Sequence, residues 1–222
     1  MYASIGKMLD LKGLGRMIAI IDYDAGNIKS VEKALQYLGE ETCVTRDPEE
    51  ILAAEKVILP GVGAFGDAMQ KLHQYGLVEV IKEVVNRRKP LLGICLGLQL
   101  LFESSEESPG VEGLGILKGK IVRFPEDAGV KIPHVGWNSL QYPNSGKLFV
   151  NVPENAFVYF VHSYYLKAED PQIVTASAWY GTPIHASVEK DQVFACQFHP
   201  EKSSETGLQI LKNFVMLGRG KN

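Results

Sequence analysis

Short apolar runs alternate with amphipathic stretches through the first hundred residues. The pattern predicts four strands, at residues 17–22, 42–45, 56–60 and 90–94, of which the first and the last are expected to be buried. Helical spacing of apolar positions marks residues 27–39, which end on a glycine, and helical sequence also fills residues 67–88. Strand–helix alternation of this kind predicts a parallel sheet with helices on both faces.

The second half of the chain has a different pattern. From about residue 117 to 198 most segments have β-type sequence, and turn-rich pieces such as PEDAG and YPNSG join them. A closing helix is predicted at about 204–217, where Leu208, Leu211 and Val215 share one face. We therefore expect an α/β fold, with a mostly parallel central sheet and an antiparallel β addition.

The composition is that of a globular protein with a hydrophobic core and no strong net charge. Of the 222 residues 45% are hydrophobic, which allows a sizeable core, and the formal charge of −3 favours neither nucleic acid nor an anionic membrane as partner. Three scattered cysteines suggest no disulfide framework and no zinc site, so we expect a reducing compartment, no metal and no cofactor.

The chain shows no targeting pattern. No apolar run approaches the roughly 20 residues of a membrane span, and the first sixteen residues lack the pattern of a signal peptide. We expect residues 1–16 to be a mobile extension, residues 17–222 to form one domain, and the protein to be cytoplasmic.

The stretch PLLGICLGLQLLF at 90–102 carries the most informative chemistry. A predicted strand runs through G-I-C-L-G at 93–97 directly into a predicted helix, which is the cysteine form of the G-x-S-x-G turn that exposes a nucleophile. The helix N-terminus favours the thiolate, the species that attacks a carbonyl. Cys95 is therefore our candidate nucleophile. Cys43 and Cys196 lack flanking glycines, and we expect them to be core residues.

A nucleophilic cysteine needs a base, usually a histidine held by a third polar group. His199 ends the predicted strand QVFACQF, and Pro200 stops that strand at once. The side chain should therefore emerge at the carboxyl edge of the sheet, where ligands bind in open α/β folds. Glu201 is near enough in the chain to orient the imidazole.

The other four histidines are weaker candidates. His162 is placed to line a pocket, but no acid follows it closely. We expect His73 at the surface of a helix, and structural roles for His185, inside a strand, and for His134, which we place before a Gly-Trp turn.

The motifs GICLGLQ and FHPEKS together resemble the class I, or triad-type, glutamine amidotransferases. The resemblance covers essentially the whole chain after the extension and implies a flavodoxin-like fold and a Cys95–His199–Glu201 triad. Four further motifs are similar to the glutaminase subunits of imidazole glycerol phosphate synthase, from histidine biosynthesis: YDAGN at 23–27, PGVGAF at 60–65, PHVGWN at 133–138 and YFVHSYY at 159–165.

The attack on an amide creates an oxyanion that needs preplaced donors. We expect these from the backbone of Leu96, just after the nucleophile, and from the glycine loop that includes Gly63. For the bound glutamine, the family pattern carries over onto Gly61, Gln99, Glu107, Ser163 and Tyr164. Glu107 has an equally open interpretation as a solvated acid in ESSEES.

The same loop matches G-x-G-x-x-G at Gly61, Gly63 and Gly66, a pattern found in dinucleotide-binding turns. Here it follows a later strand, and the acids about 20 residues on, Glu79 and Glu83, fall in a helix and not at a strand end. We therefore do not favour a nucleotide site.

The resemblance implies a glutaminase that passes ammonia to a partner. Free ammonia would be lost to water, so the acceptor enzyme should dock over the active site. By resemblance the partner is a (β/α)₈-barrel cyclase subunit, in a heterodimer. Candidate contacts flank the motifs, at Asn27, Trp137, Tyr159 and Lys202, although Trp137 could equally be a core anchor.

Three alternatives stay open. The chain could be the glutaminase of another amidotransferase, such as anthranilate synthase. It could be a non-catalytic regulatory homologue, although the presence of Cys95, His199, Glu201 and the glycine loop argues against that. It could be a cysteine peptidase or related hydrolase, which would not need Gln99.

Overall fold

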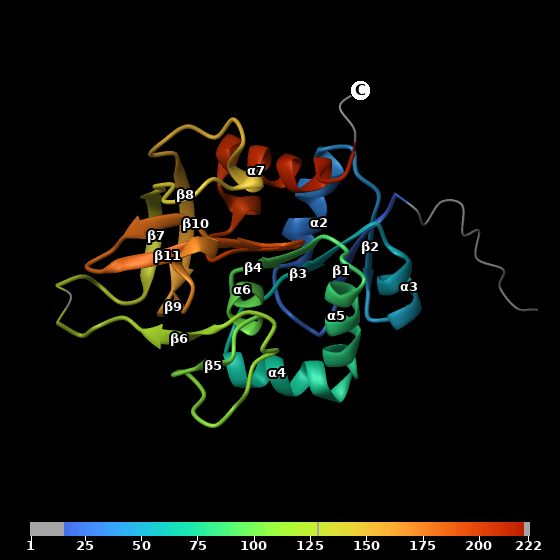
Figure 1. Cartoon of the computed structure of the whole chain (residues 1–222), viewed down its shortest axis with the longest axis horizontal. Coiled ribbons are helices and arrows are strands. Elements are labelled where there is room, and N and C mark those ends of the chain that lie inside the picture. The colour runs from blue at the N-terminus through green and yellow to red at the C-terminus, as the bar shows by residue number, and fades with distance from the viewer. Residues whose placement is uncertain (1–15, 128, 220–222) are drawn as a thin grey trace, which may run out of the picture.

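The computed structural model describes residues 16–127 and 129–219, so that residues 1–15 of the predicted extension lie outside the described residues (Figure 1). The helices are α2 Ile28–Tyr37, α3 Pro48–Ala53, α4 Phe65–Gln74, α5 Leu77–Asn86, α6 Leu96–Leu100 and α7 Ser204–Met216. The strands are β1 Ile18–Ile21, β2 Thr42–Thr45, β3 Lys56–Leu59, β4 Leu91–Ile94, β5 Ser104–Ser105, β6 Gly119–Arg123, β7 His134–Ser139, β8 Phe157–His162, β9 Tyr164–Ala168, β10 Val174–Trp179, β11 Pro183–Lys190 and β12 Val193–Cys196. Short 3₁₀ turns are η1 Lys147–Phe149, η2 Pro171–Ile173 and η3 Pro200–Lys202.

One large mixed sheet organises the described residues. Its strand order is β2-β1-β3-β4-β12-β11-β9-β6-β5, with β10 beside β11, and β7 and β8 form a separate two-stranded sheet. The strands β2, β1, β3, β4 and β12 are parallel, whereas β11, β9 and β6 pair antiparallel. The predicted parallel sheet with an antiparallel addition is therefore confirmed.

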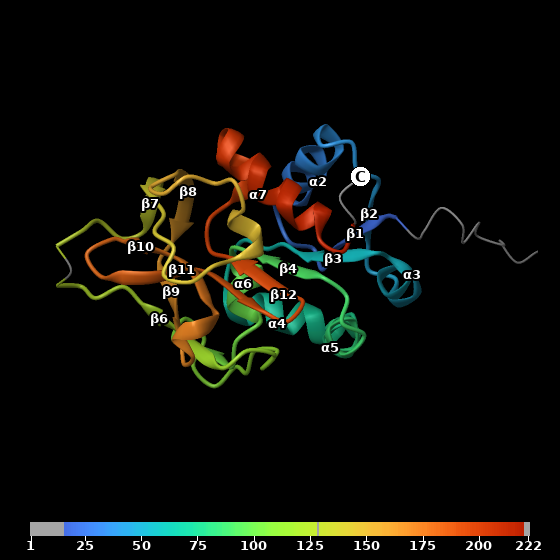
Figure 2. The same cartoon turned by 45° about the horizontal axis from the view of Figure 1, so that its top comes forward.

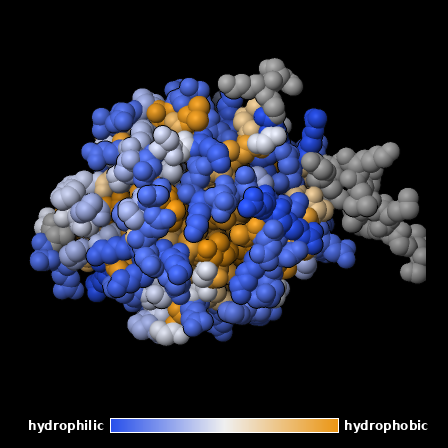
Figure 3. Space-filling view, in the orientation of Figure 1, coloured by the Kyte–Doolittle hydropathy of each residue, from blue (hydrophilic) through white to orange (hydrophobic). Residues whose placement is uncertain are grey.

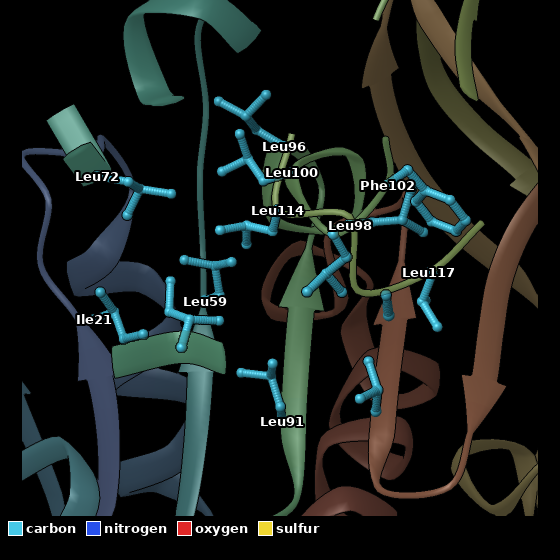
Figure 4. Close-up of a cluster of buried hydrophobic side chains, with 14 of the residues drawn as sticks. Ile21, Leu59, Leu72, Leu91, Leu96, Leu98, Leu100, Phe102, Leu114 and Leu117 are labelled. Atoms are coloured by element: carbon cyan, nitrogen blue, oxygen red, sulfur yellow. The ribbon is translucent and has the colours of Figure 1, made fainter. Parts of the chain in front are cut away.

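The central strands are apolar except at Lys56, the first residue of β3, because helices cover both of their faces. Every residue of β1, β3, β4 and β12 is buried. Ala19 and Ile21 face the cluster under α3, α4, α5 and α6, part of which Figure 4 shows, whereas Ile18 and Ile20 face α2 and α7 (Figure 2). At roughly 25 cal/mol per Å² of apolar surface, these two buried layers are the main stabilising term of the fold.

Several local expectations from the sequence need correction. The helical stretch predicted for 67–88 is divided at Gly76, whose φ of +66° ends one helix and begins the next. The β-type sequence at residues 158–166 is divided between two strands, β8 and β9, which meet at Ser163. His134 does not precede a turn but begins β7, because pairing with β8 holds the Gly-Trp dipeptide extended. Cys43 is only half-buried, because β2 is an edge strand, whereas Cys196 is fully buried as expected.

Hydrophilic residues cover most of the face drawn in Figure 3, with hydrophobic residues gathered toward its middle. Within residues 16–127 and 129–219, no helix combines the length and apolar character needed to cross a bilayer.

Two histidines are buried where the small sheet packs against the large one. His134 is stacked between Phe160 and Tyr180, with ring centroids 4.7 and 3.8 Å away. His134 Nδ1 lies 3.0 Å from His162 Nε2, and His162 Nδ1 donates to the Tyr164 carbonyl at 2.9 Å. Burial lowers the pKa of His134 to about 4 and that of His162 to about 3.

This histidine pair predicts a stability that falls with acidification. Below about pH 6.5 the unfolded chain binds protons at both positions, whereas the folded chain takes them up only near pH 4 and pH 3. The free energy of unfolding should therefore fall by up to about 1.4 kcal/mol per pH unit for each histidine. Urea unfolding between pH 7 and 4 should show a shallower pH dependence in His134→Gln than in the wild type. His73→Gln, on exposed helix surface, is the matched control and should keep the wild-type slope.

Candidate active site

The chain makes an abrupt turn where β4 passes into α6, and Cys95 stands at that turn. Its φ of 55° and ψ of −107° lie outside the regions that side-chain-bearing residues prefer. The Cys95 N–H donates to the Cys196 carbonyl at 2.8 Å. A β-carbon on Gly97 would overlap the Leu59 carbonyl, and one on Gly93 would lie 2.8 Å from the Gly97 carbonyl oxygen. Both glycines are therefore required by close packing.

Parallel pairing brings the candidate base to the same edge as the cysteine. Cys196 pairs with Ile94, so the segments that follow β12 and β4 leave the sheet side by side. His199 and Cys95 both line the cleft described below. His199 Nδ1 lies 2.8 Å from Glu201 Oε1, which leaves Nε2 as the nitrogen for proton exchange.

The charges around His199 favour its protonated form. Burial opposes the imidazolium, but interactions with Cys95 and Glu201 outweigh it and raise the pKa of His199 to about 9. Both side chains of the His199–Glu201 pair are almost fully buried. Near neutral pH the pair therefore holds a proton that His199 can donate to a leaving group.

A cleft of about 300 Å³ opens over Cys95. That volume lies in the range of small-molecule sites. Of the residues predicted from the sequence, the cleft is lined by Gly63, Cys95, Leu96, Gln99, Glu107, Ser163, Tyr164 and His199. Gly61 and Glu201 do not line it but contact residues that do, Leu96 and His199.

The hydrogen bonds of the Gln99 side-chain amide determine which of its atoms is free to bind a ligand. Its side-chain Nε2 donates to the Tyr164 carbonyl at 3.2 Å and to Gln197 Oε1 at 3.1 Å. Both of its N–H bonds are therefore used, and the amide oxygen is left as an acceptor. An acceptor of this kind suits a ligand ammonium group.

Glu107 is not simply a solvated acid. Its Oε2 accepts from the Phe65 N–H at 2.9 Å, at the first residue of α4, and the half-buried side chain also lines the cleft. A carboxylate at this position interacts favourably with the helix dipole. The structure therefore joins Glu107 both to the helix and to the cleft.

The expected oxyanion donors are close to Cys95 but are not both free. The Leu96 N–H donates to the Gly61 carbonyl at 3.2 Å, so it is occupied. Gly63, with φ of +104°, lies on the same loop and lines the cleft. Beneath the loop, the buried Tyr23 hydroxyl donates to the Pro60 carbonyl at 2.8 Å. An oxyanion could use Leu96 only after the Gly61 carbonyl moves away.

The residues predicted at a partner interface lie in different settings. Trp137 is 51% exposed and packs edge-on against Tyr159, so the alternative of a core anchor is wrong. Lys202 is exposed and directly follows Glu201 in the chain. Asn27 has a contact that the sequence did not predict, because its side-chain amide donates to Glu201 Oε1 at 2.5 Å. Asn27 therefore helps to hold the carboxylate that orients His199.

Sequence reasoning missed Gln197, Tyr23 and the position of Asn27 beside Glu201. Gln197 is 1% exposed and its Nε2 lies 3.8 Å from Cys95 Sγ. The available signal was a polar amide at the end of an otherwise apolar strand, since buried polar groups need hydrogen-bonding partners. Tyr23 gave no such signal.

Comparisons with known proteins identify the family to which this chain belongs. The family model for class I glutamine amidotransferases matches residues 19–217. The chain therefore belongs to the class I glutamine amidotransferases. Among solved structures, the fold is shared with PurLQS from Thermotoga maritima, at a TM-score of 0.70 and 22% identity over 91% of this chain and 99% of that one.

Curated relatives are much more similar in sequence. "Imidazole glycerol phosphate synthase subunit HisH" of Moorella thermoacetica is 54% identical over 92% of this chain and 96% of its own length. The subunit of the same name from Thermosynechococcus vestitus is 51% identical over 90% of this chain and 96% of its own.

The packing at the elbow predicts that Gly97→Ala is strongly destabilising. The new β-carbon meets a backbone carbonyl, which cannot rotate away, so we expect a loss of about 3 kcal/mol in the free energy of unfolding, at the upper end of the usual cost of overpacking. Gly39→Ala is the matched control, because its φ is +83° but nothing lies within 4 Å of the added carbon. It should lose only about 1–2 kcal/mol from backbone conformation. Equal losses in urea unfolding would contradict the packing argument.

Proposed function

We propose that this chain is the glutaminase subunit of an imidazole glycerol phosphate synthase. It hydrolyses glutamine to glutamate and ammonia and delivers the ammonia to a cyclase subunit. The observation that carries the proposal is the placement of Cys95 and His199 at one cleft, with Glu201 bonded to His199 behind it, in a chain about half identical to subunits of that name. The family match supports the glutamine chemistry.

In the first half of the reaction the Cys95 thiolate attacks the side-chain amide carbon of glutamine. A carbon–sulfur bond forms, the carbon–nitrogen bond breaks, and His199 protonates the departing ammonia through Nε2. In the second half His199 takes a proton from water, which then attacks the thioester and releases glutamate and the thiol. Glu201 and Asn27 hold the imidazole in orientation throughout.

The oxyanion hole requires a change in the glycine loop. Because the Gly61 carbonyl occupies the Leu96 N–H, the resting chain lacks a free donor directly after the nucleophile. Rotation of the loop would release that N–H and bring the backbone around Gly63 toward the oxyanion. Losing one such donor typically costs about 10²–10³ in rate, so a chain in this resting state should hydrolyse glutamine slowly.

The outer face of the β7–β8 sheet suits the partner. Val135, Trp137 and Val161 are exposed there beside Tyr159, and Val161 also lines the cleft. The apolar face therefore reaches the mouth of the candidate site. A (β/α)₈-barrel cyclase subunit docked on it would enclose the ammonia and exclude water.

Backbone hydrogen bonds connect the docking face to His199. The Tyr159 carbonyl accepts from the His199 N–H at 2.9 Å, and the Tyr159 N–H donates to Ser203 Oγ at 2.9 Å. Ser203 Oγ in turn donates to the His199 carbonyl at 2.6 Å. A shift of β8 would therefore displace the backbone of His199.

The function is tested by glutamate release from glutamine by the purified chain, alone and with the cyclase subunit and its nucleotide ligand. We expect strong release only in the loaded complex, and none from Cys95→Ala in any combination. Activity in the presence of a different acceptor enzyme, such as the synthase subunit of anthranilate synthase, and none with the cyclase would overturn the histidine-pathway assignment. No release in any combination would leave the regulatory alternative.

The docking face is tested by Trp137→Ala. An exposed aromatic residue at the centre of an interface typically contributes 2 kcal/mol or more, so we expect cyclase binding to weaken about 30-fold in calorimetric titration. Tyr37→Ala is the matched control, because Tyr37 is 78% exposed on α2, away from the β7–β8 sheet (Figure 1). If both variants bind the cyclase as the wild type does, the partner docks elsewhere.

A further inference from the structure

Gln197 is a buried polar residue that the hydrolysis steps above do not use. It directly follows β12 and is 1% exposed. Its backbone N–H donates to the Ala186 carbonyl at 2.8 Å, which holds the residue against the antiparallel neighbour β11. On the other side, Cys196 accepts the Cys95 N–H, so Gln197 and Cys95 follow adjacent strand ends.

The hydrogen bonds determine which end of the Gln197 amide faces the sulfur. Gln99 Nε2 is a donor only, and it lies 3.1 Å from one atom of the Gln197 amide, which must therefore be Oε1. The remaining Nε2 lies 3.8 Å from Cys95 Sγ. A flipped Gln197 amide would set two NH₂ groups against each other and an oxygen against a thiolate.

Gln99 cannot rotate its own amide to permit the flipped orientation of Gln197. Its second N–H is held by the Tyr164 carbonyl, which also accepts from His162 Nδ1 at 2.9 Å. His162 Nε2 in turn accepts from His134. Because both histidines stay neutral near pH 7, the donor and acceptor roles along this chain do not change there.

We propose that Gln197 is a positioning residue that donates an N–H to Cys95 Sγ and so favours and orients the attacking thiolate. A bond to an ionised acceptor is roughly twice as strong as one between neutral groups, so it forms mainly with the thiolate. Cys95 is only 6% exposed, which leaves little room for water to replace the donor. The proposal rests on the proposed function in one respect, that Cys95 is the nucleophile.

The test replaces the amide with apolar side chains of similar size, in Gln197→Met and Gln197→Leu. The rate of Cys95 alkylation by iodoacetamide is followed against pH, by mass spectrometry of the Cys95 peptide in a Cys43→Ser background. In this assay the thiolate forms a carbon–sulfur bond and displaces iodide, so the rate reports the thiolate fraction. We expect the pH of half-maximal rate to rise by about one unit, which makes alkylation about tenfold slower at pH values below the wild-type midpoint.

Ser187→Ala is the matched control. Ser187 is fully buried on β11 and its Oγ donates to the Ala195 carbonyl at 2.7 Å, but it does not contact the sulfur. Loss of this buried hydrogen bond should lower the melting temperature while the alkylation profile stays at the wild-type pH. Using two Gln197 variants keeps the test informative if one of them does not fold.

The outcomes separate this proposal from the proposed function. Gln197 variants that fold and keep the wild-type alkylation profile overturn the positioning role, even if the wild-type complex hydrolyses glutamine. A shifted profile in a chain whose wild-type complex releases no glutamate supports the role of Gln197 and overturns the glutaminase function. If both the positioning role and the glutaminase function are correct, kcat for glutamine in the loaded complex should fall about tenfold or more in the Gln197 variants, in line with the lost thiolate.

Discussion

The positive φ of Cys95 is the constraint on which the candidate site depends. Such a conformation costs about 1–3 kcal/mol and persists only where the surroundings over-determine it. Here the surroundings are a backbone hydrogen bond to Cys196 and the close contact of Gly97 with the Leu59 carbonyl. The turn lifts the thiol above the sheet edge and begins α6 directly behind it. If the chain continued as a strand at this point, without the turn, the side chain of Cys95 would be packed within the sheet.

The strand order supplies the rest of the site. Because β12 inserts beside β4, the last strand of the sheet delivers His199 next to a cysteine about a hundred residues earlier in the chain. The same neighbour relation places Gln197 against the sulfur. The glycine loop follows β3, on the other side of β4, so the three central strands bring Cys95, His199 and the loop to one edge.

The separate β7–β8 sheet connects this edge to the surface. Its strands carry the buried pair His134 and His162 on the inner side and the exposed Trp137 on the outer side. Neutral histidines suit this position, because a charge there would be costly to bury. The backbone of Tyr159 is hydrogen-bonded to both His199 and Ser203, so the exposed face and His199 are parts of one hydrogen-bonded unit.

Local patterns in the sequence determined the fold class and the main strands and predicted the three residues that we propose as a triad, because these depend on hydrophobic periodicity, on glycines at a tight turn and on a proline that ends a strand. The sequence could not place Asn27 beside Glu201 or Gln197 beside Cys95, since those contacts join segments that are 174 and 102 residues apart. It also placed Cys43 in the core, because the period of a strand does not show whether that strand lies at the edge of its sheet. Only the tertiary structure decided that the Leu96 N–H is occupied by the Gly61 carbonyl, because a hydrogen bond between the first residue of a helix and a distant loop depends on backbone directions that no side-chain pattern records.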